Sequence, residues 1–460
     1  MTTISTIDPA TEHEITTYEL MSRDAAFEKV ERCHGAFLKW RERTHQERAP
    51  VLRDLADALR ENVEELSERM TEETGKLLRD GRTEVELCAQ LFEYAADEGP
   101  EVLADEERTY RGGKKNGLVS YRPLGVVYSI QPWNFPVYQP VRVLAANLMA
   151  GNGVILKHAS ICTGSGLLLR DLCLEAGLPE GLFDVVVVDH DTSDEIIAHD
   201  RVRGVTLTGS DDAGRHIAQV AGRHLKKTVL ELGSNDAYLV LDDADVQRAA
   251  KTCVTGRIYN NGETCVSAKR FIVTDAVYDE FVDAFVERME AISMGDPRAE
   301  DTELGPLASQ EQFETICEQV RESLEGGATL RCGGIPEDGD RGDGYYFPAT
   351  VLTDCPPGTP AYEDELFGPV ASVIRAEDAE DAMRIANDSR YGLGGAIFSA
   401  DTDEARRMAR DEFDTGMVRI NSFGTADPNM PFGGVKDSGF GREHGGFGMK
   451  EFVNIKAIYT

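Results

Sequence analysis

Cys265, within the stretch YNNGETCVSAKR at residues 259–270, has a side chain that could act as a nucleophile. A cysteine thiolate attacks electrophilic carbon readily when its surroundings favour the charged form. A free cysteine is also among the residue types most often buried in a core. Taken alone, Cys265 is therefore better explained as a small buried apolar residue, and the case for catalysis depends on what accompanies it.

Two further segments contain polar side chains that such chemistry would need. Asn134 lies between Pro132 and Pro136 on a stiffened loop that follows a β-branched run, and its amide could donate to an oxyanion. Glu231 closes an apolar run in LELGSND at 230–236, where burial would raise the pKa of its carboxyl group toward general-base range. Asn134 could instead form a structural Asx turn, and Glu231 could be a paired structural carboxylate.

A glycine-containing turn could bind phosphate. The stretch LTGSDDAG at 207–214 places Gly209 and Ser210 between a strand-like run and a helix that contains Gly214. A helix N-terminus attracts anions such as a pyrophosphate, and glycine lets a ligand approach the backbone closely. The stretch lacks the G-x-G-x-x-G spacing of a dinucleotide fingerprint, so an ordinary β–α turn remains the alternative.

The elements that would position these residues follow an α/β pattern. Residues 24–104 have apolar side chains at intervals of three and four, which predicts helices, and 108–122 predicts a hairpin around a glycine-rich turn. From 124 onward, short β-branched runs alternate with helical segments, and a second such series covers about 250–430. Buried strands that alternate with helices form parallel sheets. The sequence therefore predicts two doubly wound α/β domains and a small β element.

The composition excludes several classes of partner. The chain has 460 residues, with 82 acidic against 48 basic side chains and a net charge of −34. Because nucleic acids and anionic membranes need a basic face, we expect neither as a partner. The nine cysteines are scattered without a C-x-x-C pair, so neither a disulfide framework nor a metal site is expected. Without a signal peptide or a long apolar run, the sequence predicts a cytoplasmic protein with reduced thiols.

Taken together, the motifs resemble the aldehyde dehydrogenase superfamily, in order and along nearly the whole chain. The matching segments are PWNFP (132–136), LKHAS (156–160), LTGSDDAG (207–214), LELG (230–233), GETC (262–265), ELFGPV (365–370), YGLGGAIFS (391–399) and PFGGVKDSGFGRE (431–443). The separation of 34 residues between Glu231 and Cys265 is also what that family shows. Each motif is weak alone, but the ordered set is specific.

The resemblance implies a role for each candidate residue. Cys265 would attack an aldehyde carbon, and the Asn134 amide with the Cys265 backbone N–H would stabilise the oxyanion. Hydride transfer to NAD or NADP would leave a thioester, and water activated by Glu231 would hydrolyse it to a carboxylic acid. The residues that the resemblance assigns to the cofactor are Trp133, Lys157, Ser160, Gly209, Ser210, Gly214, Glu365 and Phe367.

Departures from the family pattern concern the cofactor and the base. Many NAD-preferring members have a glutamate where this chain has Ser160, and that glutamate repels a 2′-phosphate. Ser160 removes the repulsion and Lys157 could pair with the phosphate, so NADP should be accepted. Ser234 replaces the usual glycine and Ala237 a common proline near Glu231, and the sequence assigns Ser234 no role.

The substrate class is inferred from Arg142. It occupies the position at which succinate-semialdehyde dehydrogenases place an arginine, whose forked guanidinium suits a substrate carboxylate. Several segments also look closest to members of that group that accept NAD or NADP, although Tyr259 stands where others keep a second arginine. Arg142 could instead be a surface helix residue. The alternatives are a broad-specificity aliphatic aldehyde dehydrogenase, a cofactor-free thiol esterase and a catalytically silent relative.

By resemblance the chain divides into three parts. Residues 1–104 and 124–232 would bind the dinucleotide, and residues 233–437 would form the catalytic domain. Residues 105–123 and 438–460 would form an oligomerisation element. The hairpin and the C-terminal strand expose edges that need partners, so a homodimer or homotetramer is expected.

The acidic residues are spread along the chain, and 13 of the 48 basic residues are lysines. A dispersed acidic surface with few lysines suits a salty cytoplasm, because salt screens the self-repulsion that would otherwise loosen the fold. We predict that the thermal unfolding midpoint falls when KCl is lowered from molar concentration to about 0.1 M. A midpoint that stays constant or rises at low salt, measured by circular dichroism, would contradict this expectation.

Overall fold

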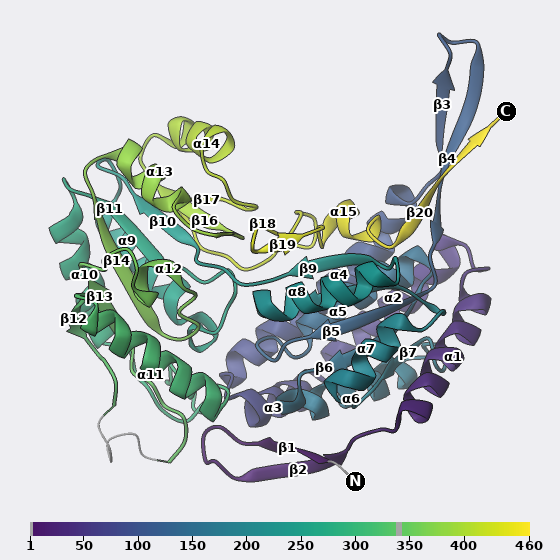
Figure 1. Cartoon of the computed structure of the whole chain (residues 1–460), viewed down its shortest axis with the longest axis horizontal. Coiled ribbons are helices and arrows are strands. Elements are labelled where there is room, and N and C mark those ends of the chain that lie inside the picture. The colour runs from purple at the N-terminus through teal and green to yellow at the C-terminus, as the bar shows by residue number, and fades with distance from the viewer. Residues whose placement is uncertain (1–2, 337–342) are drawn as a thin grey trace.

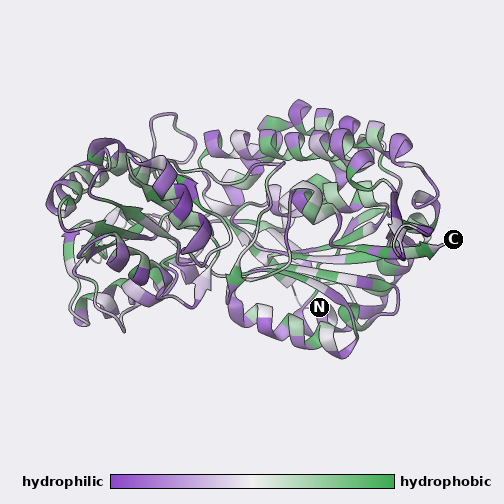
Figure 2. Ribbon diagram, turned by 90° about the horizontal axis from the view of Figure 1, so that it is seen from above, coloured by the Kyte–Doolittle hydropathy of each residue, from purple (hydrophilic) through white to green (hydrophobic). Residues whose placement is uncertain are grey.

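The chain folds into two lobes, each built around its own sheet, in a computed structural model that describes residues 3–336 and 343–460 (Figure 1). The strands are largely apolar, while the helices that surround them carry polar residues on their outer sides (Figure 2). Both main sheets are mostly parallel, with helices between successive strands. This arrangement confirms the predicted α/β class.

The first lobe contains a six-stranded sheet in the order β19-β9-β8-β5-β6-β7. Its strands are parallel except β19, which pairs antiparallel with β9. The strands are β5 (Val126–Gln131), β6 (Gly153–His158), β7 (Phe183–Val185), β8 (Val202–Thr208), β9 (Lys227–Glu231) and β19 (Gly439–Phe440). The helices of this lobe are α1 (Arg23–Trp40), α2 (His45–Glu61), α3 (Val63–Thr74), α4 (Leu78–Val102), α5 (Tyr138–Ala150), α6 (Thr163–Glu175), α7 (His190–Ala198) and α8 (Asp211–Arg223), with a 3-10 turn η1 (Ser160–Cys162).

The order of strands in this sheet reverses at β5, which defines a binding edge. The chain proceeds from β5 through β6 and β7 on one side, and β8 and β9 lie on the other. Ligands of open α/β sheets bind at such a switch point, outside the carboxyl ends of the strands. The loop after β5 contains Asn134, and Glu231 is the last residue of β9. Both residues therefore lie at the edge where a ligand is expected.

The second lobe contains a seven-stranded sheet in the order β12-β13-β14-β11-β10-β16-β17, parallel except for β12. The strands are β10 (Ala237–Val240), β11 (Arg270–Thr274), β12 (Thr329–Cys332), β13 (Thr350–Thr353), β14 (Val370–Ala376), β16 (Gly395–Phe398) and β17 (Arg419–Ile420). The helices are α9 (Val246–Ile258), α10 (Tyr278–Glu290), α11 (Gln310–Glu325), α12 (Pro360–Glu363), α13 (Ala379–Asn387) and α14 (Thr402–Asp411), and the turn η2 (Tyr259–Gly262) follows α9. Two short strands, β15 (Tyr391–Gly392) and β18 (Val435–Lys436), pair beside this sheet.

A third sheet projects from the first lobe (Figure 1). It has the order β20-β4-β3 and joins the predicted hairpin, β3 (Glu106–Tyr110) and β4 (Lys115–Pro123), to the C-terminal strand β20 (Val453–Tyr459). The rest of residues 438–460 lies elsewhere, because β19 pairs with β9 and α15 (Gly445–Met449) packs against α4 and α5. The segment expected to mediate oligomerisation is thus shared between two parts of the molecule.

Two local features differ from the sequence prediction. The hairpin of β1 (Thr3–Ile7) and β2 (Glu14–Glu19) was not predicted. Its strands carry threonines in place of large apolar residues, so the alternation of apolar and polar residues that indicates a strand is weak. The helical run at 48–75 is divided at Asn62, whose φ of −111° and ψ of 23° are not helical. The Asn62 amide donates to the Ala58 carbonyl (2.8 Å), a side-chain bond that competes with the helix. No helix among the described residues has the length and apolar character needed to cross a membrane.

The turn that leads to Cys265 has an unusual backbone. Asn260, Asn261 and Gly262 have φ angles of 52°, 57° and 78°, all in the left-handed region. Asparagine tolerates this region, and the side chain of Asn261 also donates to the carbonyl of Gly75 (3.0 Å). Consecutive left-handed residues end α9 sharply, and the chain then turns into the loop that contains Cys265.

A methyl group on Gly262 would overlap the backbone of Gly368. We predict that Gly262→Ala lowers the free energy of unfolding by about 3 kcal/mol or more, because the clash adds to left-handed strain. Gly177→Ala is the matched control, since Gly177 also has a positive φ (89°) but no heavy atom within 4 Å of the added methyl. That control should lose only about 1 kcal/mol in urea unfolding, and equal losses would contradict the prediction.

Candidate active site

The candidate residues converge where the two lobes meet. The first sheet contributes the carboxyl ends of its strands, with Asn134 after β5 and Glu231 at the end of β9. The second sheet contributes its amino ends, because Lys269 directly precedes β11. The amide of Asn260 donates to the Asn134 backbone carbonyl (2.9 Å) and so connects the two loops. The structure therefore brings the regions of Cys265 and Asn134 together, although they are distant in sequence.

Cys265 differs from every other cysteine in its accessibility. The chain has nine free cysteines, all within the described residues; eight are buried and Cys265 is partly exposed. Burial raises the pKa of its thiol to about 12, while the positive charges of Arg142 and Lys269 act in the opposite direction. The eight buried cysteines behave as small apolar residues, whereas Cys265 has the access and the cationic neighbours that a nucleophile needs.

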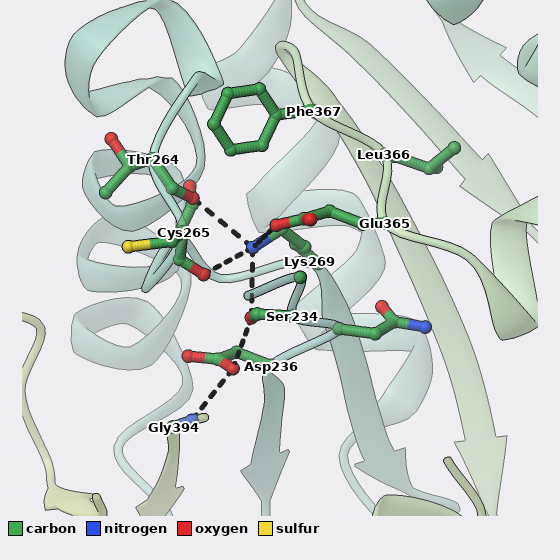
Figure 3. A network of polar contacts seen from close by, with 12 residues as sticks. Ser234, Asp236, Thr264, Cys265, Lys269, Glu365, Leu366, Phe367 and Gly394 are labelled. Carbon is green, nitrogen blue, oxygen red and sulfur yellow. Dashed lines mark hydrogen bonds and ion pairs between the residues drawn. The ribbon is translucent and has the colours of Figure 1, made fainter. Parts of the chain in front are cut away.

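Lys269 links the Cys265 loop to Glu365 within the second lobe (Figure 3). Its side chain is 1% exposed, and its ammonium donates to the backbone carbonyls of Cys265 (2.6 Å) and Thr264 (3.2 Å). The same ammonium forms an ion pair with Glu365 (3.1 Å). A buried lysine thus fixes the loop of the candidate nucleophile and a candidate cofactor-binding carboxylate to each other.

Ser234, which replaces the usual glycine of the family, is part of the same network (Figure 3). Its hydroxyl accepts from Lys269 (3.2 Å) and donates to Asp236 (2.6 Å). The Asp236 carboxylate also accepts from the backbone N–H of Gly394 (2.9 Å). Burial raises the pKa of Asp236, and Lys269 opposes that shift. Ser234 therefore supplies a hydrogen bond between two buried charges that glycine could not provide.

Asn134 is held by its backbone while its side chain remains available as a donor. The residue is 5% exposed, and its carbonyl accepts from Lys76 (3.0 Å) as well as from Asn260. Its amide oxygen accepts from Gln139 (3.4 Å). The amide nitrogen has no acceptor among the described residues. A rigid, buried loop with a free amide donor is what stabilisation of an oxyanion requires.

Glu231 is a buried carboxylate without hydrogen-bond partners. The residue is 2% exposed, and neither of its carboxylate oxygens has a partner among the described residues. Burial raises the pKa of Glu231 well above its usual range; Glu443 reinforces the shift and Arg142 opposes it. A desolvated carboxyl group with free oxygens, next to other charges, has the properties of a general base.

The structure gives Arg142 partners that differ from the expected ones. Its side chain is fully buried in α5, so it is not a surface residue, and it forms an ion pair with Glu443 and donates to the Thr208 hydroxyl (2.6 Å). Its guanidinium also lies over the rings of Tyr138 and Phe432, 5.4 and 5.1 Å from their centroids. A substrate carboxylate would have to displace Glu443. The contacts also place Arg142 within electrostatic range of Glu231 and Cys265.

The β8–α8 turn fits a phosphate group. Ser210 is exposed and caps α8, where it accepts from the N–H of Ala213 (3.3 Å). A methyl group added to Gly209 would meet only Leu207, at 3.7 Å, so the backbone there is open to a ligand. Gly214 is small for another reason, because a side chain would collide with Leu232 (2.5 Å) and push α8 away from the sheet.

The other expected cofactor residues are spread around this turn. Lys157 lies half-buried near the end of β6, where burial lowers the pKa of its ammonium, and Ser160 is exposed at the start of η1. Trp133 and Phe367 pack edge to face with ring centroids 5.6 Å apart, although they come from different lobes. The exposed hydroxyls, the open backbone at Gly209 and Lys157, which has no ion pair in the described chain, fit a dinucleotide. Phe367 and Glu365 come from the other lobe.

A cavity of about 310 Å³ lies in the second lobe near the Cys265 loop, and its acidic lining residues are Asp236 and Asp427. Val266 and Phe432 line it, and these two residues also pack against Cys265. Arg419, on β17, is the one cationic residue among its lining residues, which all lie in the described chain. Within the described residues, no group of three or more His, Cys, Asp or Glu side chains is arranged to hold a metal ion.

Sequence reasoning did not single out Lys76, Lys269, Glu443 or Arg419. Lys76 is 1% exposed with Glu84 as its ion-pair partner (2.8 Å). In a sequence, such a lysine looks like the solvated lysines of other helices. The sequence does contain both Lys269 and the unusual Ser234. Their contact joins two distant positions, however, and becomes visible only once the fold is known.

Relatives of known type share this architecture. A model of the aldehyde dehydrogenase family matches residues 1–458. The chain is 42% identical to a succinate-semialdehyde dehydrogenase [NADP(+)] of Deinococcus radiodurans, over 99% of this chain and 94% of that protein. A protein of the same name from Mycobacterium avium is also 42% identical, over 99% and 96%. The crystal structure of a succinic semialdehyde dehydrogenase from Streptococcus pyogenes with NADP+ superposes with a TM-score of 0.96 at 38% identity, over 99% of both chains.

A partly exposed cysteine lies where two α/β lobes meet, near a buried amide donor and a buried carboxylate, and this arrangement fits a dinucleotide-dependent enzyme. The chain belongs to the aldehyde dehydrogenase family. It is an NAD(P)-dependent aldehyde dehydrogenase, and the predicted superfamily is confirmed.

The Lys269 network predicts the reactivity of the thiol. In the cofactor-free enzyme, Lys269→Met should shift the pH profile of Cys265 alkylation by iodoacetamide to higher pH. The loss of a positive charge, next to the remaining acids, raises the pKa of the thiol and lowers the thiolate fraction at any given pH. Ser234→Gly keeps the ammonium and should shift the profile less. An unchanged profile in a folded Lys269→Met variant would contradict the role of this charge.

Proposed function

We propose that this enzyme oxidises succinate semialdehyde, or a closely related short aldehyde with a terminal carboxylate, to the dicarboxylic acid. The observation that carries the proposal is the cavity beside Cys265, in which Arg419 is the cationic residue. The names of relatives that are 42% identical over 99% of this chain support the same substrate class.

In the first step, the Cys265 thiolate adds to the aldehyde carbon, and the carbonyl oxygen gains the negative charge of a thiohemiacetal. The Asn134 amide nitrogen donates to that oxygen, together with the backbone N–H of Cys265. The negative oxygen makes the carbon a better hydride donor than the free aldehyde. A nicotinamide cofactor held at the β8–α8 turn would supply the acceptor for this hydride, and Cys265 would then carry the acyl group as a thioester.

In the second step, Glu231 removes a proton from a water molecule as that water attacks the thioester. Its free, buried oxygens can accept this proton, and its raised pKa makes it a stronger base than an exposed carboxylate. The products are the carboxylic acid and the free Cys265 thiol. Glu443 and Arg142 set the electrostatic environment of this base from within the first lobe.

NADP+ is proposed as a cofactor at least as good as NAD+. Ser160 is exposed and carries no charge that would repel a 2′-phosphate, and Lys157 lies three positions earlier at the end of β6. An ammonium without an ion pair among the described residues is suited to a phosphate. The relatives from Deinococcus radiodurans and Mycobacterium avium are both named for NADP(+).

A homo-oligomer in the cytoplasm is proposed for the same protein. The three-stranded sheet projects away from the first lobe, and β20 carries exposed apolar residues such as Ile455 and Ile458. Its edges can pair with another copy, as a dimer or a tetramer. The acidic surface proposed for high salt and the three-part division of the chain remain part of this proposal.

The experiment that tests the function measures formation of the reduced cofactor in molar KCl with succinate semialdehyde and with butanal, using NAD+ and NADP+ in turn. A preference for the acidic aldehyde supports the proposal, and equal rates favour a broad-specificity aliphatic aldehyde dehydrogenase. Cys265→Ala should abolish oxidation while cofactor binding remains, which controls for folding. Ester hydrolysis without any cofactor-dependent oxidation would favour the thiol esterase instead.

Glu231→Gln tests the second step. The variant should retain the rapid first turnover of reduced cofactor but lose about 10²–10⁴-fold in steady-state rate, because thioester hydrolysis lacks its base. The wild-type steady-state rate should rise with pH as the carboxyl group loses its proton, and the variant should lack this rise. Stopped-flow absorbance measures both phases, and a normal steady-state rate after the first turnover would contradict the assignment.

Arg419→Gln tests the substrate carboxylate site. Loss of a charge-assisted hydrogen bond should raise the KM for succinate semialdehyde by about 10-fold or more and leave the KM for butanal nearly unchanged. Arg406→Gln, an exposed arginine of α14, is the matched control and should change neither value. Equal effects of Arg419→Gln on the two aldehydes would exclude a contact with the carboxylate.

A further inference from the structure

A second cavity, of about 590 Å³, lies at the foot of the projecting sheet. It is bounded by the α1–α2 junction and the first turn of α2 at 41–48, the end of α4, the end of β4, Lys456 of β20, and Ala150. None of its lining residues lines the cavity beside Cys265. Nothing in the proposed reaction uses this cavity.

The charge of this cavity is opposite to that of the whole chain. Its basic lining residues are Arg41, Arg43, Arg48, Arg122 and Lys456, with His45 beside them. The acidic ones are Glu42 and Asp105. The chain as a whole has 82 acidic against 48 basic residues, so a local excess of cations is not what its composition produces by chance. A cavity with cations on several walls concentrates anions from solution.

These cations also lack the partners that arginines have elsewhere in this protein. Within the described chain, the ion pair that involves the cavity cations is Arg41 with its neighbour Glu42, at 3.8 Å. Arg60, on the same helix as Arg48, contacts two glutamates, at 2.9 and 2.5 Å. The cavity cations are thus left for something other than the protein's own carboxylates.

Arg48 is the buried cation among the lining residues. It is 3% exposed and donates to the carbonyls of Met149 (2.9 Å) and Arg41 (3.2 Å), yet its Nε has no partner. A buried guanidinium is normally paired with an acid. Burial, with the like charges of Arg122 and Arg43, lowers the pKa of Arg48 to about 10. An anion in the cavity would relieve this repulsion.

The start of α2 adds a further donor set. This helix has 17 residues, and its N-cap and first turn, Thr44 to Gln46, line the cavity. The positive end of the helix dipole therefore points toward the same space as the arginines. Glu47, the acid of this first turn, is engaged by the Thr44 backbone (2.7 Å) in a capping box.

We propose that this cavity binds a small multivalent oxyanion, a phosphate or a polycarboxylate, at a site separate from the catalytic centre. The charge, the forked donors and the buried Arg48 select carboxylate or phosphate oxygens over neutral ligands. A ligand held by the α1–α2 junction and by β4 and β20 at once would stabilise the attachment of the projecting sheet to the first lobe.

The test is thermal unfolding at constant ionic strength in KCl, with potassium phosphate or potassium citrate up to about 20 mM. Saturating NADP+ is present, so that the phosphate sites of the cofactor are filled. We expect one or both anions to raise the unfolding midpoint. The double variant Arg43→Gln/Arg122→Gln, which removes two exposed arginines, should bind the anion about tenfold or more weakly. Arg331→Gln/Arg406→Gln removes two arginines elsewhere and should behave like the wild type.

A second readout follows the site directly. The guanidinium of Arg43 lies 4.8 Å from the Trp40 ring centroid, and Trp133→Phe leaves Trp40 as the sole tryptophan. Anion binding should change its fluorescence in that variant, and Arg43→Gln should abolish the change. A response to phosphate alone or citrate alone supports the proposal and identifies the anion class. No response to either anion, or equal responses in the double variant, would overturn it. So would a double variant that loses its oligomeric mass without any anion effect, since a partner subunit would then fill the cavity.

Discussion

The two hydrogen bonds that the Asn134 backbone carbonyl accepts hold the proposed catalytic groups in fixed relative positions. One donor, Lys76, belongs to the first lobe, and the other, Asn260, belongs to the turn that leads to Cys265 in the second. An oxyanion donor must lie about 3 Å from the oxygen that it stabilises, so a small shift between the lobes would remove its effect. The buried ion pair of Lys76 with Glu84 and the left-handed turn before Cys265 both serve this contact.

Buried charges in the site are arranged as cations shared between acids. Arg142 contacts Glu443 and lies within electrostatic range of Glu231, and Lys269 pairs with Glu365 and reaches Asp236 through Ser234. Each cation offsets part of the cost of desolvated carboxylates without neutralising them completely. Burial, reinforced by Glu443, raises the pKa of the Glu231 carboxyl group, and Arg142 and Lys269 limit the rise in the pKa of the Cys265 thiol. The same charges that stabilise the interior therefore tune the base and the nucleophile.

The distribution of arginines outside the site follows a different rule. On the acidic surface, arginines such as Arg60 and Arg407 each contact two acidic side chains. Exposed pairs of this kind add little stability one by one, but they lower the repulsion within a chain of net charge −34. The cavity at the foot of the third sheet departs from this rule, because Arg43, Arg48, Arg122 and Lys456 gather there without ion-pair partners among the described residues.

The sequence alone was enough to identify the α/β class and the family from the order of its motifs, and it proposed Cys265, Glu231 and Asn134 as the catalytic residues. Strand and helix periodicity is local, and an ordered set of motifs survives without knowledge of contacts. The tertiary structure decided the rest. Arg142 appeared as a substrate ligand or a surface residue, yet packing buried it against Glu443, and Arg419 on β17 became the cation of the cavity. The way in which the two sheets meet decides which charged side chains face a ligand. Contacts between residues more than a hundred positions apart produce no periodic pattern in the sequence.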